Sequence, residues 1–239
     1  MSLTPQEFFY LIKKRKNIMC ILIKDLFDLS MTLASSILNP NDYPWMSLAK
    51  IHDFILTIGP TLSKEEYLSL ADNVWISKSA KIHKNAEICG PAIIGANTEL
   101  RTGAYIRGNV IIGENCVIGN SCEVKNSIIF NNAQVPHFNY IGDSILGYKA
   151  HTGAGAITSN VKSDKTLVKV FYDGKVIETG LKKFGAIIGD HAEIGCNSVL
   201  NPGTIIGRNS NVYPLSSVRG YVPQSSIYKS KDDIVLKNN

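Results

Sequence analysis

The stretch VWISKSAKIHKNAEICGPAIIGANTELRTGAYIRGNVIIGENCVIGNSCEVKNSIIFNNAQV, from Val74 to Val135, decides the fold of this chain. Every sixth residue in it is aliphatic or phenylalanine. A period of six fits neither an amphipathic helix nor an alternating strand. It is typical of a hexapeptide-repeat parallel β-helix, in which each hexad gives one short strand and one turn and three hexads close a triangular coil. The inward positions predicted by this count are Ile76, Ile82, Ile88, Ile94, Leu100, Ile106, Ile112, Ile118, Val124 and Phe130.

Two further regularities support the same fold. Small residues stand two positions before the aliphatic ones, where they allow the chain to turn a corner while it stacks on the coil below: Ala80, Ala86, Ala92, Thr98, Ala104, Val110, Cys116 and Cys122. The period of six also returns later in the chain, at Ile188, Ile194, Leu200, Ile206, Val212 and Val218. The sequence therefore predicts a mainly β protein with a β-helix over residues 73–224.

The residues before the β-helix carry helix signals. Thr4, Pro5 and Glu7 form a capping box with proline at the first helical position, and Ser63 with Glu66 forms a second box. We expect helices near residues 17–38 and 45–58, separated by a turn cluster from Asn39 to Pro44. The prediction is a small N-terminal α-helical domain over residues 1–72 that covers the open end of the β-helix. A regulatory or partner-binding role for it stays open, and residues 225–239 are expected to form a C-terminal tail.

Composition indicates an ordinary folded protein, with 44% hydrophobic and 19% charged residues and a net charge of +5. The basic cluster Lys13–Lys16 has no aromatic residues or binding motif beside it, so we interpret it as a solvated helix face and expect no nucleic-acid partner. Charges at Lys24, Asp25 and Asp28 interrupt the apolar stretch 18–38, which argues against a membrane helix. The five cysteines include no CxxC pair and suggest a reducing compartment, so the expected location is the cytoplasm.

The hexad register breaks twice in the second half of the chain. It is lost after Phe130 and resumes at Leu146, which predicts an inserted loop near residues 137–143. A second excursion spans about residues 159–184, where the segment 168–177 has the pattern of a β-hairpin that turns at Asp173 and Gly174. Insertions in repeat proteins become loops on one face, where functional residues often gather.

Two cations near the first insertion predict an anion site. Arg107 and Lys125 are eighteen residues apart and each follows an inward aliphatic residue, so in a coil of three hexads they stack at about 4.8 Å. Their repulsion, about 1 to 3 kcal/mol, would be relieved by a bound anion. The alternatives are that both side chains extend into solvent, or that Glu123 neutralises one of them.

His137, in the expected insertion, is a candidate for chemistry, although a lone histidine is more often structural. The other histidines, His52, His83, His151 and His191, form no metal-binding pair, so we expect no metal site. This pattern argues against the zinc-dependent hexapeptide-repeat carbonic anhydrases.

Three segments together resemble a known family. They are Gly119–Asn126 (GNSCEVKN), Pro136–Asp143 (PHFNYIGD) and Gly153–Asn160 (GAGAITSN), and the intervals between them are kept without gaps. They are similar to the acetyltransferase half of the bifunctional bacterial and archaeal enzymes that acetylate glucosamine-1-phosphate and then transfer a uridylyl group to the product. The resemblance continues to about Val222. It implies a left-handed β-helix that assembles as a homotrimer with sites between subunits.

The resemblance also implies roles for particular residues. His137 matches the general base of the family and Glu123 the carboxylate that holds its imidazole. Acetyl-CoA is the implied co-substrate. The positions that match substrate contacts are Arg107, Lys125, Tyr140, His151, Asn160 and Lys165, and those that match coenzyme A contacts are Ala154, Cys196, Pro214 and Arg219.

The chain departs from the family at several points. His151 stands in place of an asparagine, the spacing of Lys165 is one residue short, and the first third has no glycine-rich nucleotide-binding loop. We therefore predict an acetyl-CoA-dependent N-acetyltransferase for an amino-sugar phosphate such as glucosamine-1-phosphate, without uridylyltransferase activity. A non-catalytic binding or assembly module, and an acyltransferase for a nucleotide-linked amino sugar, are the alternatives.

Overall fold

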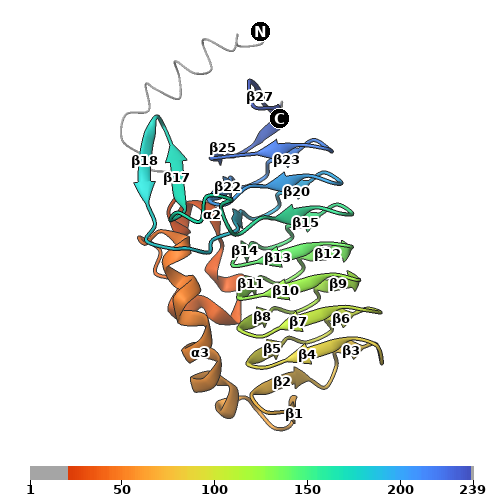
Figure 1. The fold of residues 1–239 in the computed structure, drawn as a ribbon. Helices are drawn as coiled ribbons and strands as arrows, with labels where there is room; N and C mark the ends of the chain where they lie inside the picture. Colours follow the sequence, from red (N-terminus) through yellow and green to blue (C-terminus); the bar gives the residue numbers. More distant parts are fainter. Residues whose placement is uncertain (1–20, 238–239) are drawn as a thin grey trace.

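The computed structural model describes residues 21–237, which form a parallel β-solenoid with three faces (Figure 1). Each coil contributes one short strand to each face. Sheet A contains, in spatial order, β1 (Tyr67–Ala71), β2 (Val74–Ser77), β5 (Ala92–Ile94), β8 (Val110–Ile112), β11 (Ser127–Ile129), β14 (Ile145–Leu146), β19 (Ala186–Ile188), β22 (Thr204–Ile206) and β25 (Tyr221–Val222). Sheet B contains β3 (Lys81–Ile82), β6 (Glu99–Leu100), β9 (Val117–Asn120), β12 (Gln134–His137), β15 (His151–Thr152), β20 (Glu193–Ile194), β23 (Asn211–Val212), β26 (Ser226–Ser230) and β27 (Asp233–Leu236). Sheet C contains β4 (Glu87–Cys89), β7 (Tyr105–Arg107), β10 (Glu123–Lys125), β13 (Tyr140–Gly142), β16 (Ile157–Thr158), β21 (Val199–Leu200) and β24 (Ser217–Val218).

The interior of the solenoid is filled as the period of six predicts. Leu100, Ile106 and Ile118 are at most 1% exposed and belong to one continuous core. The corners need a residue with a positive φ, and asparagine tolerates this conformation better than most side chains, as at Asn97 (φ 56°) and Asn115 (φ 54°). The hexapeptide-repeat β fold is confirmed.

The first register break has a different cause from the predicted insertion. Ile129 pairs with Ile112 of the coil below, 17 residues earlier. Leu146 pairs in turn with Ile129, again 17 residues earlier. These coils are each one residue short of three hexads, so Ile129 points inward and Phe130 does not. The inserted loop predicted near residues 137–143 is therefore wrong, because this segment follows the strand register without an extra residue.

The N-terminal segment lies along the outer face of sheet A and not over the open end of the solenoid (Figure 1). It contains α2 (Ile23–Leu26), α3 (Ile51–Ile58) and 3₁₀ turns at Leu29–Met31, Leu33–Ile37, Pro44–Lys50 and Gly59–Thr61. The outward residues of sheet A that it covers are all fully buried: Ile93, Ile111, Ile128, Ile145, Ile187 and Ile205. Trp45, Ile51 and Ile55 pack against them, and the ring of Phe27 lies 5.0 Å from that of Phe130. The predicted covering of the open end is therefore wrong.

Both ends of the described chain are covered by strands. Residues 63–66 form a turn that leads into β1, so the helix predicted from the second capping box is wrong. β1 pairs antiparallel with β2 and covers the edge of the first coil. At the other end, β26 continues sheet B and β27 folds back on it, where the sequence predicted a tail. The capping box at Thr4–Glu7, the basic cluster Lys13–Lys16 and Cys20 lie outside the described residues.

The second excursion contains the predicted hairpin. β17 (Lys169–Tyr172) and β18 (Lys175–Glu178) pair antiparallel and turn at Asp173 and Gly174. Val168, Val170 and Phe184 are fully buried in the cluster that also holds the N-terminal segment. The excursion is therefore part of the layer that covers sheet A.

Candidate functional site

Arg107 and Lys125 stack on the outer face of sheet C, as their spacing predicted. β10 pairs with β7 so that Val124 lies over Ile106, which sets Lys125 over Arg107. Each cation already has a carboxylate partner. Arg107 Nη1 lies 2.6 Å from Glu123 Oε1, and Lys125 Nζ lies 3.2 Å from an oxygen of Asp143. The repulsion that motivated the anion site is thus offset within the chain itself, as one of the alternatives anticipated for Glu123.

Asp143 is the centre of a polar network that the sequence analysis missed. Its side chain is 5% exposed and accepts hydrogen bonds from Lys125 Nζ, from Asn126 Nδ2 at 2.8 Å and from Asn160 Nδ2. The residue occupies the corner between sheets C and A with φ 48°, a conformation that aspartate and asparagine adopt more readily than most residues. Asp143 therefore fixes the positions of Lys125 and Asn160, two of the predicted substrate residues.

Tyr140 joins this network from the same strand as Gly142. Asn160 Nδ2 donates to the hydroxyl of Tyr140 at 3.1 Å, which leaves the phenolic proton able to donate to a ligand. Burial, followed by the negative charges of Asp143 and Glu123, raises the pKa of Tyr140 and keeps it protonated. A Cβ at residue 142 would lie 2.5 Å from the Tyr140 hydroxyl, so only glycine leaves room for the ring.

His137 and three predicted coenzyme A contacts stand in one line at the corner between sheets B and C. We call this line the corner column and define it by Asn120, His137, Ala154, Cys196 and Pro214. Backbone bonds set the succession: the N–H of residue 138 donates to Asn120 O at 2.9 Å, that of 155 to His137 O at 3.0 Å, that of 197 to Ala154 O at 2.8 Å and that of 215 to Cys196 O at 2.9 Å. The side chain of His137 is exposed beside sheet C. The prediction that these residues lie together is supported by this geometry.

Asn139, a second residue that the sequence analysis missed, holds the turn that carries His137. It is 3% exposed, and its amide donates to Gly153 O at 2.8 Å and to Ala156 O at 3.1 Å. Its side-chain oxygen accepts from His137 N at 3.1 Å. The buried amide thereby ties the His137 turn to the next coil of the corner column.

Glu123 does not contact His137 in this state of the protein. Among residues 21–237, its carboxylate bonds to Arg107. The role of Glu123 in orienting His137 stays a prediction.

Three other predicted residues lie apart from this arrangement on a single chain. His151 is on sheet B, where its Nδ1 lies 2.7 Å from Glu193 Oε2. Lys165 is exposed on the excursion before β17. Arg219 is exposed immediately after β24, at the upper end of sheet C.

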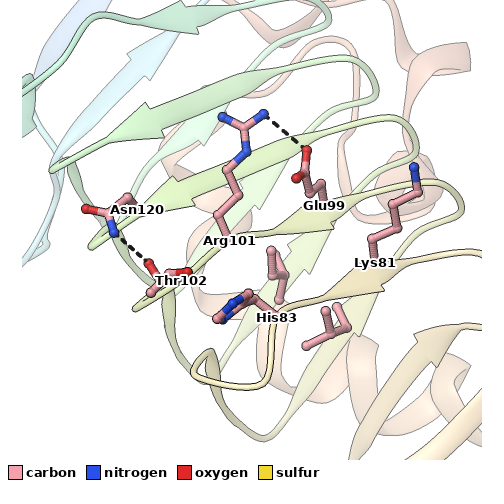
Figure 2. Close-up of a pocket in the computed structure, with 8 residues that line it drawn as sticks. Lys81, His83, Glu99, Arg101, Thr102 and Asn120 are labelled. Carbon is pink, nitrogen blue, oxygen red and sulfur yellow. Dashed lines mark hydrogen bonds and ion pairs between the residues drawn. The ribbon is translucent and has the colours of Figure 1, made fainter.

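Two hollows border these residues. The larger, about 500 Å³, lies on the lower coils of sheet B and is shown in Figure 2. Lys81, His83, Glu99 and Arg101 line it, Arg101 pairs with Glu99 at 3.1 Å, and Asn120 connects it to the corner column.

The smaller hollow, which we call the corner cavity, measures about 330 Å³ and is the one that the sheet C network reaches. It is lined by Lys125, Asn126, Asp143 and Asn109 of the solenoid, by Leu48, Ala49 and His52 of the N-terminal segment, and by Leu181 and Lys183 of the excursion. Lys183, and not the predicted Lys165, is the excursion lysine at this cavity. The N–H of Gly185 donates to Asp143 O at 2.9 Å, which returns the chain to this corner just after Lys183.

Other kinds of site find no support in the described part of the chain. Residues 21–237 contain no helix long and apolar enough to cross a membrane. No group of three histidine, cysteine, aspartate or glutamate side chains in this range could hold a metal ion. Cys116 and Cys122 are buried in the solenoid core, and burial raises the pKa of Cys116 to about 12.

Comparison with known proteins identifies the family. Residues 88–169 match the family model "GMPPB C-terminal domain", and residues 185–220 match "Bacterial transferase hexapeptide (six repeats)". The "Bifunctional sugar-1-phosphate nucleotidylyltransferase/acetyltransferase" of Sulfurisphaera tokodaii is 35% identical over 177 residues, which cover 66% of this chain and 44% of that protein. The "Bifunctional protein GlmU" of Methanococcus vannielii is 34% identical over 196 residues, 81% of this chain and 47% of that protein. The chain thus spans about half the length of these bifunctional relatives.

A relative of more similar length is the "Uncharacterized acetyltransferase YaiX" of Escherichia coli O6:K15:H31. It is 34% identical over 191 residues, which cover 72% of this chain and 79% of that protein. With both hexapeptide models matched and the solenoid formed as the repeats require, the chain belongs to the family of hexapeptide-repeat acetyltransferases.

Proposed function

We propose that this protein transfers the acetyl group of acetyl-CoA to the amine of an amino-sugar phosphate such as glucosamine-1-phosphate. The observation that carries the proposal is that the corner column, with His137 at its lower part, stands beside the polar network of Tyr140, Asn160 and Lys125 on sheet C. A donor along the column and an acceptor on the sheet would meet at His137. The GlmU name of the Methanococcus relative supports this acceptor class.

In the proposed reaction, the amine nitrogen attacks the thioester carbonyl carbon while neutral His137 takes a proton from the amine. The C–S bond then breaks and the thiolate of coenzyme A leaves and is protonated. Oxyanion stabilisation would come from a backbone N–H in the turn 153–155. The N–H groups of Gly153 and Gly155 already donate to Ile194 O and His137 O, so the donor in this turn would be Ala154 N–H.

Acetyl-CoA would extend from His137 toward the upper coils. Ala154, Cys196 and Pro214 succeed one another there at the coil spacing of about 4.8 Å, and Arg219 follows on the same coil as Pro214. Arg219 would then meet a phosphate of coenzyme A. No metal takes part in this scheme.

We also propose that the active form is a homotrimer. The N-terminal segment and the excursion cover sheet A, so sheets B and C are the faces on which copies could meet. His151 on sheet B would then reach an acceptor held on sheet C of a neighbour. Sedimentation equilibrium tests this, and a monomer at micromolar concentration would contradict both the trimer and the shared site.

A nucleotide-linked amino sugar is the second candidate acceptor. The hollow on sheet B connects to the corner column at Asn120, and its lysine and arginine would suit further phosphate groups (Figure 2). A thiol-release assay with acetyl-CoA separates the candidates. We expect turnover with glucosamine-1-phosphate to exceed that with glucosamine and with a nucleoside-diphosphate amino sugar; absence of turnover with every acceptor would refute the enzyme.

A further inference from the structure

The N-terminal segment contributes a histidine to the corner cavity. His52 stands in the first turn of α3, and its side chain faces the solenoid corner where Lys125, Asp143 and Lys183 meet. The ring is held there, because His52 Nδ1 lies 2.9 Å from Asn109 Oδ1. This contact joins the layer over sheet A to the acceptor side of the site.

The charges around the cavity favour an anion. Asp143 is its only acidic lining residue, and that carboxylate is nearly buried and already accepts from Lys125, Asn126 and Asn160. Lys183 is exposed, and no carboxylate within residues 21–237 forms an ion pair with it. A ligand that enters the cavity therefore meets lysine ammonium groups and an imidazole, with the one negative charge already neutralised.

The bond to Asn109 determines what His52 can offer. An amide oxygen only accepts, so the Nδ1 atom of His52 carries the hydrogen of this bond. The Nε2 atom is then an acceptor in the neutral ring and a donor in the protonated ring. A phosphate oxygen beside Nε2 would favour the protonated ring, since a charge-assisted bond to an anion stabilises the charged form.

We propose that His52 binds the phosphomonoester of the acceptor, together with Lys125 and Lys183, and that the N-terminal segment is thereby part of the acceptor site. The inference rests on the proposed amino-sugar phosphate acceptor. Lys125 provides the geometric link: it rises from the middle of sheet C, and its Nζ ends at the corner beside Asp143. Between this corner and His137 the sheet presents Gly142 and Tyr140, over which the sugar ring would lie.

The test is calorimetric binding of glucosamine-1-phosphate and of glucosamine, without acetyl-CoA, to the full chain and to variants of residue 52. His52→Gln keeps a donor for Asn109 but removes the charge, and His52→Arg keeps a charge. We expect His52→Gln to weaken glucosamine-1-phosphate by about fivefold to tenfold, as for one charge-assisted hydrogen bond at an exposed site. His52→Arg should retain most of the affinity, and glucosamine and acetyl-CoA should bind each variant as they bind wild type.

Neighbouring lysines supply matched controls. Lys50→Ala, two residues before His52, and Lys182→Ala, next to Lys183, remove exposed cations that do not line the cavity and should leave phosphate binding unchanged. Lys183→Ala should weaken it by about tenfold or more. If Lys50→Ala and His52→Gln had equal effects, the charge of the segment as a whole would be responsible and the inference would fail.

The outcomes separate this inference from the proposed reaction. Wild-type protein that binds glucosamine-1-phosphate in the expected variant pattern but never releases thiol from acetyl-CoA would refute the reaction and support the phosphate site. Unchanged affinity in His52→Gln, or an equal loss for glucosamine and its phosphate, would overturn the role of His52 and leave the reaction standing. If wild type binds neither glucosamine-1-phosphate nor inorganic phosphate, the site itself is refuted.

Discussion

Asp143 should contribute more to stability than any exposed ion pair of the solenoid. Replacing it by asparagine keeps the side-chain shape and the positive φ of the corner, so Asp143→Asn changes mainly the charge. The variant leaves Lys125, whose side chain is 22% exposed, without its counter-ion, and it places an amide where Asn126 and Asn160 now donate to a carboxylate. Breaking a fully buried pair costs about 3 to 5 kcal/mol, and the residual exposure of Lys125 reduces this to about 2 to 4 kcal/mol.

This loss should be visible in thermal unfolding followed by circular dichroism. For a chain of this size we expect the melting temperature to fall by about 5 to 15 °C, at about 2 to 4 °C per kcal/mol. Glu193→Gln is the matched control, because Glu193 pairs with His151 but is 50% exposed, and exposed pairs contribute about 0 to 1 kcal/mol. If Asp143→Asn melted no lower than Glu193→Gln, the network would not be a structural centre and the assigned positions of Lys125 and Asn160 would lose their physical basis.

Three further predictions address the chemistry. His137→Ala should lower kcat in the thiol-release assay by about 10² to 10⁴ while acetyl-CoA binding is kept, and retention of more than about a tenth of kcat would remove the general-base assignment. Arg107→Ala and Lys125→Ala should each raise the KM for the sugar phosphate by about tenfold or more and leave the KM for acetyl-CoA unchanged; equal changes for both substrates would contradict a phosphate role. Iodoacetamide at pH 8 should label exposed Cys196 and spare Cys116, whose buried thiol has a pKa raised to about 12, and peptide mass spectrometry that found Cys116 labelled first would contradict the inward packing.

The pairing of Arg107 with Glu123 changes what stability measurements on Arg107→Ala should give. If the two stacked cations were unpaired, removal of one charge would relieve repulsion and raise the melting temperature. Because Glu123 lies 2.6 Å from Arg107 in an exposed pair, we expect almost no change. The same contact implies a competition, since an acceptor phosphate that binds Arg107 would release Glu123 toward His137.

Much of the solenoid could be predicted because one inward residue per hexad is a strictly periodic requirement. The count failed where adjacent apolar residues offered a choice, since Ile128, Ile129 and Phe130 can each fill a core. The structure uses the middle one and shortens the coil, and a count in sixes has no means of detecting a coil of 17 residues. The false insertion near residues 137–143 followed directly from this.

The site was predictable in the parts where the resemblance quoted whole segments. His137, Ala154, Cys196 and Pro214 stand in a column because each occupies the same corner of successive coils, and the hexad register preserves this. Lys183 was missed because the excursion destroys the register between residues 159 and 185. The signal that could have identified it is the repeat of Asn109-Val-Ile-Ile-Gly113 as Gly185-Ala-Ile-Ile-Gly189, which marks the return to the corner of Asp143.

The position of the N-terminal segment also had a signal in the sequence. Strands of sheet A carry two adjacent aliphatic residues, as in Ile93 with Ile94 and Ile111 with Ile112, whereas strands of sheets B and C carry one. A strand that is apolar on both faces must be covered on both, so the second residue of each pair predicts an outer layer over that sheet alone. The end of a solenoid needs only its strand edges paired, which β1 and β27 achieve with a few residues. Once sheet A is covered, the ligands and any second copy of the chain are restricted to sheets B and C and their corners, and the corner between C and A is accessible only beside α3, where His52 lies.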